Sequence, residues 1–299
     1  DVTKEMINFV PGIVPGIGMA MNSFTRPGDK VMIQPPVYHP FAWVTTRNER
    51  TLVTNPLKWE NGMYRMDLDA FREQGKGCKL FILCNPHNPG GVVWTEDELR
   101  TVAEICYEEK VLVFSDEIHA DLTLPPYKHR PFATISEKAK MNSVTFMSPS
   151  KAFNMPGLAA SHAIIFNEDL RARFRKFMDA GELDMGHVFA FLSVEAAYTH
   201  GTEWLDQCLA YIQGNIDYVD NFLKTHAPRI KAIRPQASYL VWLDCRELGL
   251  NQEALNDFFA DKAHLALNDG AMFGKEGTGY MRLNVASPRS VIEQAMKQL

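Results

Sequence analysis

The sequence predicts a three-layer α/β/α fold, in which helices cover both faces of a mostly parallel sheet, followed by a smaller C-terminal α+β domain. Over the first two-thirds of the chain, short apolar runs alternate with amphipathic stretches, which is the pattern of consecutive strand–helix units. The chain has 299 residues, of which 46% are hydrophobic, and this is enough to bury a sizeable core.

Five apolar runs are candidate buried strands of the sheet, at residues 31–33, 80–84, 111–115, 144–147 and 163–166. The clearest helix between them runs from about residue 95 to 109. Thr95 is a suitable N-cap, and Glu98 follows three residues later. An apolar stripe marks the face of this helix that packs on the sheet, formed by Leu99, Val102, Ala103 and Cys106.

A long helical pattern with few breaks, from about residue 187 to 225, predicts one or two helices that lead into the second domain. We therefore expect a large domain at residues 1–188, and a linker helix with a small domain at 189–299. The small domain is expected to contain strands at 238–243 and 280–285, a helix at 252–262 and a final helix from Pro288. Asp1 is not a methionine, which suggests that an N-terminal stretch is missing from this sequence.

Composition argues against several classes of protein. The chain carries 31 basic and 36 acidic residues, so its charge favours neither nucleic acid nor an anionic membrane as a partner. The five cysteines are scattered without a CxxC pair, which favours small buried hydrophobes in a reducing cytosol over a disulfide framework or a zinc site. Neither a signal peptide nor a long apolar segment is evident, and we expect a cytoplasmic protein.

Unusual polar clusters follow the predicted strands, where an open parallel sheet binds its ligands. The first, Asn-Pro-His-Asn-Pro-Gly-Gly at residues 85–91, is a stiff, turned loop. An asparagine in it can offer its amide to a ligand oxygen, although an ordinary strand-to-helix turn is equally compatible with this loop.

The second cluster, Ser-Asp-Glu-Ile-His-Ala-Asp, occupies residues 115–121. An acid at the end of a buried strand is costly unless it is paired. Such an aspartate could pair with a protonated pyridine nitrogen and make the ring an electron sink. A helix N-cap or a metal-binding acid cluster are the alternatives, and a metal is disfavoured because no second ligand group stands at suitable spacing.

The third cluster is Ser-Pro-Ser-Lys at residues 148–151. A lysine between small hydroxyl residues at a strand end can be partly desolvated, which favours attack of its amine on an aldehyde, while the serines can donate to a phosphate. A solvated surface lysine is the alternative. The fourth feature, Arg282 in the apolar run 281–285, suits a carboxylate bidentately or forms a structural ion pair with an internal acid.

Two weaker features support this set. Pro-Gly-Ile-Val-Pro-Gly at residues 11–16 precedes a helical stretch that runs to about Phe24, and glycine-rich backbone at a helix N-terminus is suited to phosphate. Tyr38 follows residues 34–37 and would present an aromatic face at another strand end.

Taken in this order, the motifs resemble fold-type I pyridoxal-phosphate (PLP) enzymes of aminotransferase class I/II, over essentially the whole chain. Residues 115–122, 148–158 and 281–289 are most similar to the MalY/PatB branch, whose members are cystathionine β-lyases, also called cysteine-S-conjugate β-lyases.

The resemblance implies a role for each matching residue. Lys151 would carry pyridoxal 5'-phosphate covalently, Asp116 would pair with the pyridine nitrogen, and Arg282 would bind the substrate α-carboxylate. The remaining implied cofactor contacts are Asn88 at the phenolic oxygen with His119 beside it, Tyr38 stacked on the ring, and Ser148, Ser150 and the backbone of Gly12 and Ile13 at the phosphate.

Two departures from common aminotransferases match the lyase branch better. Many aminotransferases have a tyrosine at the position that His119 occupies here, and many have a phosphate-binding arginine where this chain has Ala159. The resemblance therefore implies a lyase that cleaves cystathionine or S-substituted cysteines to a thiol, pyruvate and ammonia. Transamination of an amino-acid substrate by the same site is the alternative, and a PLP-fold regulator acting through protein contacts is a third hypothesis. The family also implies a homodimer with its active site at the subunit interface.

Overall fold

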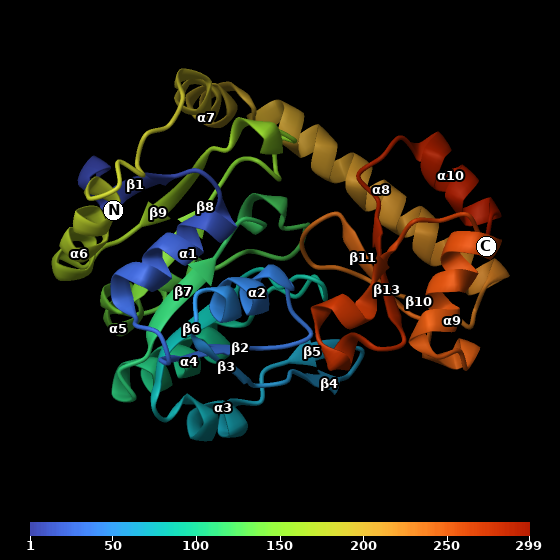
Figure 1. The fold of residues 1–299 in the computed structure, drawn as a ribbon. Helices are drawn as coiled ribbons and strands as arrows, with labels where there is room; N and C mark the ends of the chain where they lie inside the picture. The colour runs from blue at the N-terminus through green and yellow to red at the C-terminus, as the bar shows by residue number, and fades with distance from the viewer.

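The computed structural model describes residues 1–299 and contains three β-sheets (Figure 1). The strands are β1 Ile7–Val10, β2 Lys30–Ile33, β3 Thr51–Thr54, β4 Lys58–Glu60, β5 Met63–Arg65, β6 Cys78–Cys84, β7 Leu112–Asp116, β8 Ser143–Met147, β9 Ser161–Ile164, β10 Lys231–Ile233, β11 Leu240–Asp244, β12 Asn268–Asp269 and β13 Tyr280–Asn284. The α-helices are α1 Ile13–Phe24, α2 Pro40–Arg47, α3 Leu68–Gly75, α4 Glu96–Glu108, α5 Glu137–Met141, α6 Glu168–Asp179, α7 Val188–His200, α8 Thr202–His226, α9 Gln252–Asp257 and α10 Arg289–Lys297.

The largest sheet has seven strands in the order β1-β9-β8-β7-β6-β2-β3. All neighbouring pairs from β8 to β3 are parallel, and only β9 runs against its two neighbours. A mostly parallel sheet is therefore present as predicted. Its parallel strands all end at one edge, and the polar clusters follow at that edge.

Helices cover both faces of this sheet, which makes the three predicted layers. Successive side chains of β6 point to opposite faces, so Ile82 contacts the core beneath α1, α2 and α6, while Phe81 contacts the core beneath α3, α4 and α5. Phe81 and Ile82 are almost completely buried in these two cores. Since a strand with two apolar faces needs cover on both, the continuous apolar run of β6 explains its central place.

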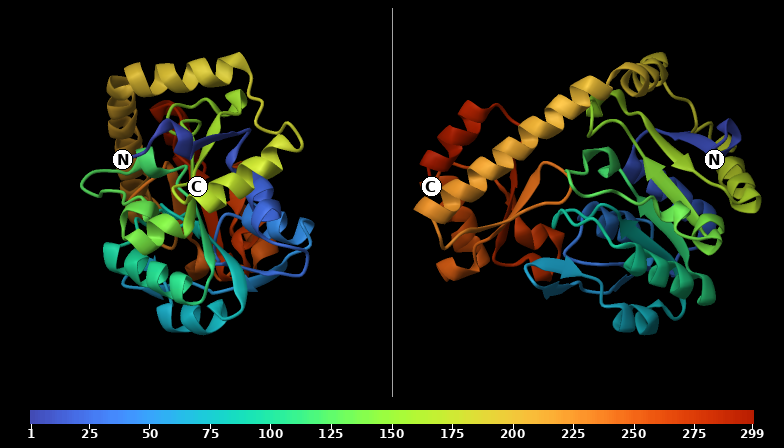
Figure 2. Two further views of the ribbon diagram at one scale, coloured as in Figure 1. Left: turned by 90° about the vertical axis from the view of Figure 1, so that its left-hand side faces the viewer. Right: turned by 180° about the vertical axis from the view of Figure 1, so that it is seen from behind.

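The C-terminal part has its own antiparallel sheet, in the order β10-β11-β13-β12, with α8, α9 and α10 packed around a third core. Figure 2 shows α8 extending from the end of α7 to the C-terminal helices. The other face of this second sheet is not separate, because Trp242 and Tyr280 belong to the same core as β6 and α4. A boundary at residue 188 stays a prediction.

Individual elements agree with the sequence, with small shifts. The Thr95–Glu98 capping box is formed at the start of α4, and the helical pattern at 187–225 is two helices, α7 and α8. The last strand of the large sheet lies at Ser161–Ile164, two residues earlier than predicted. The helix predicted at 252–262 changes to a π-helix at Phe258. None of the helices combines the length and apolar character that a membrane crossing needs.

Candidate active site

A cavity of about 470 Å³ lies at the carboxyl-end edge of the large sheet, between this sheet and the C-terminal sheet. Its walls come from the N-terminus of α1, from the segments that follow β2, β6, β7 and β8, and from β13. Nine of the ten predicted site residues line it, namely Gly12, Ile13, Tyr38, Asn88, Asp116, His119, Ser150, Lys151 and Arg282. The fold therefore brings together residues that lie up to 270 positions apart in the sequence, Gly12 and Arg282.

Asp116 ends β7 and is 3% exposed. Its Oδ1 accepts a hydrogen bond of 3.1 Å from the backbone N–H of Ile118, and no basic side chain forms a salt bridge with it. Burial raises the pKa of the Asp116 carboxyl to about 7, against smaller lowering effects that include Lys151. A buried carboxylate without a cationic partner is suited to a cationic group of a ligand.

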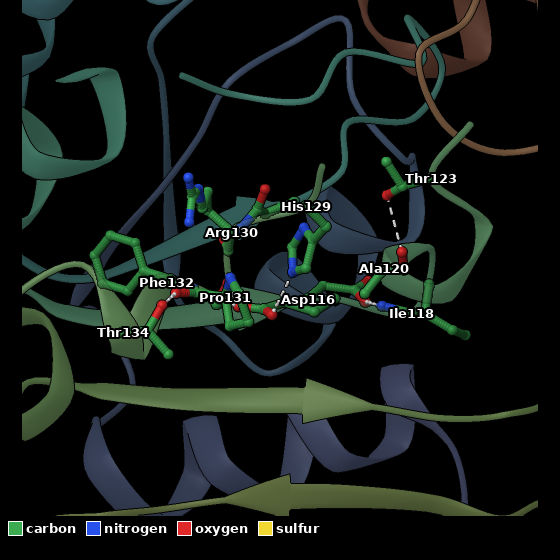
Figure 3. A network of polar contacts seen from close by, with 12 residues as sticks. Asp116, Ile118, Ala120, Thr123, His129, Arg130, Pro131, Phe132 and Thr134 are labelled. Atoms are coloured by element: carbon green, nitrogen blue, oxygen red, sulfur yellow. Dashed lines mark hydrogen bonds and ion pairs between the residues drawn. The ribbon is translucent and has the colours of Figure 1, made fainter. Parts of the chain in front are cut away.

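The next residue, Glu117, does not line the cavity, and its side chain enters a buried polar network with His129 and Phe132, two residues that Figure 3 shows. Its side chain is fully buried, and its Oε1 accepts hydrogen bonds from Ser115 Oγ at 2.8 Å and from the backbone N–H of Phe132 at 2.9 Å. His129 Nε2 lies 2.8 Å from the other oxygen, Oε2. These contacts hold the segment at 129–132 against the end of β7, so the backbone that presents Asp116 is fixed from behind.

Lys151 stands in the turn after β8 and is half-buried in the cavity wall. Its amine forms no salt bridge, although it lies close enough to Asp116 and His119 to affect both of their pKa values. The lysine and the aspartate thus face a common space, as a bound pyridine ring requires. The solvated-surface alternative for Lys151 does not hold.

Ser148 is the one predicted site residue outside the cavity lining. It is 2% exposed, and its hydroxyl donates to the carbonyl oxygen of Ala160 at 2.6 Å. The Ser148 Oγ also accepts from the backbone N–H of Ser150 at 3.1 Å. In this structure Ser148 fixes the turn that presents Ser150, and its contact with phosphate stays a prediction.

The N-terminus of α1 opens on the same cavity beside Ser150. Gly12 is the N-cap at φ 154°, a conformation that side-chain-bearing residues rarely adopt, and Ile13 begins the helix. The first N–H groups of a helix have no partners within it, and they carry the positive end of the helix dipole. This end of the cavity is suited to an anion such as phosphate.

Arg282 lies on β13 and reaches across to the loop after β6. Its Nη1 donates to Asn88 Oδ1 at 2.9 Å, and its Nη2 donates to Asn268 Oδ1 at 2.7 Å. The guanidinium lies 4.7 Å from the ring centroid of Phe273 and has no carboxylate partner. The structural ion pair is therefore excluded, and a partly buried cation remains available for a ligand carboxylate.

The same contact orients Asn88. Because Oδ1 accepts from Arg282, the amide Nδ2 points the other way, and it makes no hydrogen bond in the protein. This Nδ2 can donate to a ligand oxygen in the cavity.

His119 and Tyr38 complete the polar wall. Burial, followed by the charges of Lys151 and Arg282, lowers the pKa of His119 to about 3, so its imidazole is neutral at physiological pH. Burial raises the pKa of the Tyr38 phenol, which keeps that phenol protonated. Tyr38 packs edge-on against Phe41, with ring centroids 5.6 Å apart, so its position is fixed from the core side.

Sequence reasoning missed several lining residues, of which His39, Ser161, Tyr239 and Asn284 are polar. Asn284 stands two positions after Arg282 on β13 and shares its face of the strand, so strand periodicity could have found it. Tyr239 precedes β11 and contacts the cavity only because the second sheet packs there; no local signal marks it.

Comparisons with known proteins agree with this geometry. A family model described as aminotransferase class I and II matches residues 1–299. The chain is 40% identical to cystathionine beta-lyase PatB of Bacillus subtilis, over 100% of this chain and 78% of that protein. It is 30% identical to protein MalY of Escherichia coli, over 100% of this chain and 76% of that protein. The crystal structure of cystalysin from Treponema denticola, which contains a pyridoxal 5'-phosphate cofactor, superposes with a TM-score of 0.97 at 35% identity, covering 100% of this chain and 76% of that one.

Proposed function

Because the chain belongs to the aminotransferase class I and II family, we propose that it is a PLP-dependent carbon–sulfur β-lyase, which cleaves cystathionine or S-substituted cysteines to a thiol, pyruvate and ammonia. The observation that carries this proposal is the shared cavity of Lys151, Asp116 and Arg282. An amine, a buried carboxylate and a carboxylate-binding cation are the groups that PLP chemistry on an amino acid needs. Similarity to a cystathionine β-lyase favours elimination over transamination.

The cavity fits PLP residue by residue. We assign Lys151 to the cofactor's aldehyde, Asp116 to its ring nitrogen and Asn88 Nδ2 to its phenolic oxygen. Tyr38 would stack on the ring, with His119 beside the phenolic oxygen. Ser150 and the backbone at Gly12 and Ile13 would bind the phosphate. When bound, PLP supplies an electrophilic aldehyde and a protonated ring that withdraws electrons from the substrate.

Three residues of the chain have distinct roles in the proposed reaction. Arg282 binds the α-carboxylate through its planar fork and so fixes the direction of the Cα–H bond. With PLP bound, the Lys151 amine would act as the base that takes the proton from Cα. Ionised Asp116 would hold the ring nitrogen of bound PLP in its protonated form. The Cβ–S bond breaks, the sulfur leaves with the bonding electrons, and the proton held by Lys151 is available to it. One water is consumed as pyruvate and ammonia form.

An absorption spectrum with and without borohydride tests the cofactor assignment. Purified protein loaded with PLP should absorb in the visible range, and reduction should fix the cofactor covalently on the peptide that contains Lys151. Lys151→Ala should abolish this trapping, while Lys297→Ala, at an exposed position in α10, should not. Trapping that persists in Lys151→Ala contradicts the assignment.

Pyruvate formation distinguishes the lyase from an aminotransferase, the alternative that shares every residue named above. The lyase releases pyruvate from a cysteine conjugate with no added 2-oxo acid, whereas an aminotransferase needs that acceptor. We further propose that the enzyme acts as a cytoplasmic homodimer, as the family resemblance implies, and sedimentation of the holoenzyme measures its subunit number.

A further inference from the structure

A cavity of about 480 Å³ lies at the C-terminal ends of α1 and α2, away from the active site. We call it the arginine cavity, because three arginines line it, Arg26, Arg47 and Arg50. Both helices begin at predicted cofactor contacts, since α1 starts at Ile13 and α2 follows Tyr38. The 12 residues of α1 place the arginine cavity about 18 Å from the active-site end of that helix. The two cavities have no lining residue in common.

Arg50 is a buried cation, 6% exposed, whose hydrogen-bond partners are all uncharged. Its Nε donates to Thr25 Oγ1 at 2.8 Å, and its Nη2 donates to the carbonyl oxygen of Thr25 at 2.8 Å. Its Nη1 donates to Asn22 Oδ1 at 2.9 Å and to the carbonyl oxygen of Asn48. These bonds leave one N–H of Nη2 without a partner. Because a buried charge is costly unless it is paired, Arg50 offers an anion a charge that the protein has not neutralised.

The other two arginines of this cavity have free guanidinium groups. Arg26 and Arg47 are exposed, and neither side chain forms a salt bridge or donates a hydrogen bond within the protein. The Arg47 guanidinium lies 5.3 Å from the ring centroid of Trp43, a contact that orients it without using its N–H donors. Both side chains can therefore turn toward a ligand in the arginine cavity.

The acids near the arginine cavity do not neutralise it. Glu49 is the only acid of the lining, so three arginines against one glutamate give the lining a formal charge of +2. Asp29 stands outside the lining and accepts from the backbone N–H of Arg26 at 2.7 Å. Burial lowers the pKa of Arg50, and the negative charges of Asp29 and Glu49 offset that effect only in part. An arginine stays protonated in spite of such a shift, so the charge remains for a ligand.

A neighbouring cavity adds positive charge to this part of the molecule. Phe24, the last residue of α1, lines it, and its charged lining residues are all cations, Lys79, Lys110 and Arg173. Arg173 also contacts α1 directly, because its Nη2 donates to the carbonyl oxygen of Ser23 at 3.2 Å. The whole chain carries a formal net charge of -5, so these cations are concentrated against the overall balance. The local field therefore attracts anions to the end of α1.

We propose that the arginine cavity is an anion site that binds phosphate, either as the free ion or as the phosphate group of a small monoester. A dianion matches the formal charge of the lining, and the planar fork of a guanidinium suits phosphate oxygens. The volume of about 480 Å³ is in the range of small-molecule sites, so an organic group has space beside Phe177. This site is separate from the active site and does not depend on the proposed reaction.

Calorimetric titration with inorganic phosphate tests the site, on PLP-loaded enzyme so that the phosphate end of the active site is already occupied. We expect saturable binding of phosphate. Arg26→Gln and Arg47→Gln change exposed side chains, which the fold should tolerate, and each should raise Kd about two- to fivefold, the effect of one exposed ion pair. Glu49→Gln removes the acid of the lining and should lower Kd by a similar factor. Arg50→Lys loses the planar fork and should raise Kd about tenfold; the exposed variants decide the matter if it does not fold.

Arg130→Gln is a matched control, because Arg130 is also exposed and without a salt bridge but lies outside both basic cavities. It should leave Kd unchanged. Phenyl phosphate distinguishes the two forms of the ligand: tighter binding than inorganic phosphate identifies a monoester, and equal or weaker binding identifies the free ion. The proposal is overturned if no saturable binding is seen at about 10 mM phosphate. An equal loss in Arg130→Gln, or a loss in Lys110→Gln without one in Arg47→Gln, overturns it as well.

Discussion

Replacing Arg282 by lysine tests the substrate-binding half of the proposed site. The guanidinium is held by two amide oxygens, Asn88 Oδ1 at 2.9 Å and Asn268 Oδ1 at 2.7 Å, and it lies over Phe273. No carboxylate of the protein neutralises it. Lysine keeps the positive charge but cannot reproduce a planar fork, so the substrate carboxylate loses bidentate binding while its ion pair is retained.

The expected cost follows from one lost charge-assisted hydrogen bond. Such a bond contributes about 1.5–3 kcal/mol, which corresponds to a decrease of about 10- to 150-fold in kcat/KM. Arg282→Leu removes the charge as well and should reduce kcat/KM further. Because Arg282 also orients the Asn88 amide, cofactor affinity is measured beside turnover, and we expect it to change less than kcat/KM does.

Pyruvate release from S-benzylcysteine, coupled to lactate dehydrogenase, measures this effect. Arg289→Lys is a matched control, because Arg289 also donates to an asparagine oxygen, Asn215 Oδ1 at 2.8 Å, and lies over an aromatic ring, Tyr218, without lining the cavity. Wild-type kcat/KM in Arg282→Leu, or an equal loss in Arg289→Lys, would refute the reasoning.

Two further predictions concern groups behind and beside the cofactor site. Burial raises the pKa of Asp116 from 3.8 to about 7 in the cofactor-free protein, so the stability that protonated Asp116 contributes is complete below pH 3.8 and is lost as the pH rises through 7. Asp116→Asn should flatten this part of the stability profile in urea denaturation, and an unchanged slope between these pH values would contradict the assigned burial. His129→Leu leaves one oxygen of the fully buried Glu117 side chain without its 2.8 Å partner and should destabilise the fold by about 1.5–3 kcal/mol. His129→Gln retains a donor and should cost less; equal denaturation midpoints for the two variants would count against this role.

Much of the site could be predicted because its motifs are local. Asp116, Lys151 and Asn88 each follow a buried apolar strand, and the carboxyl ends of parallel strands converge at one edge of a sheet. The contact of the Ser148 hydroxyl with the carbonyl oxygen of Ala160 could not be predicted in this way, since Ala160 lies 12 residues away across a turn. Glu117 stands beside Asp116 in the same motif, and only the fold shows that it points to His129 instead of the cavity.

The sequence by itself determined the alternation of strands and helices, the cap of α4 and the polar clusters that carry the chemistry. Each depends on residue spacing within a few turns or one strand, where backbone geometry is repeated and local. The tertiary structure decided which clusters meet. Asn88 and Arg282 are 194 residues apart and bond only because the second sheet packs over the edge of the first. The amide partners of Arg282, in place of an acid, depend likewise on long-range packing, which no local pattern encodes.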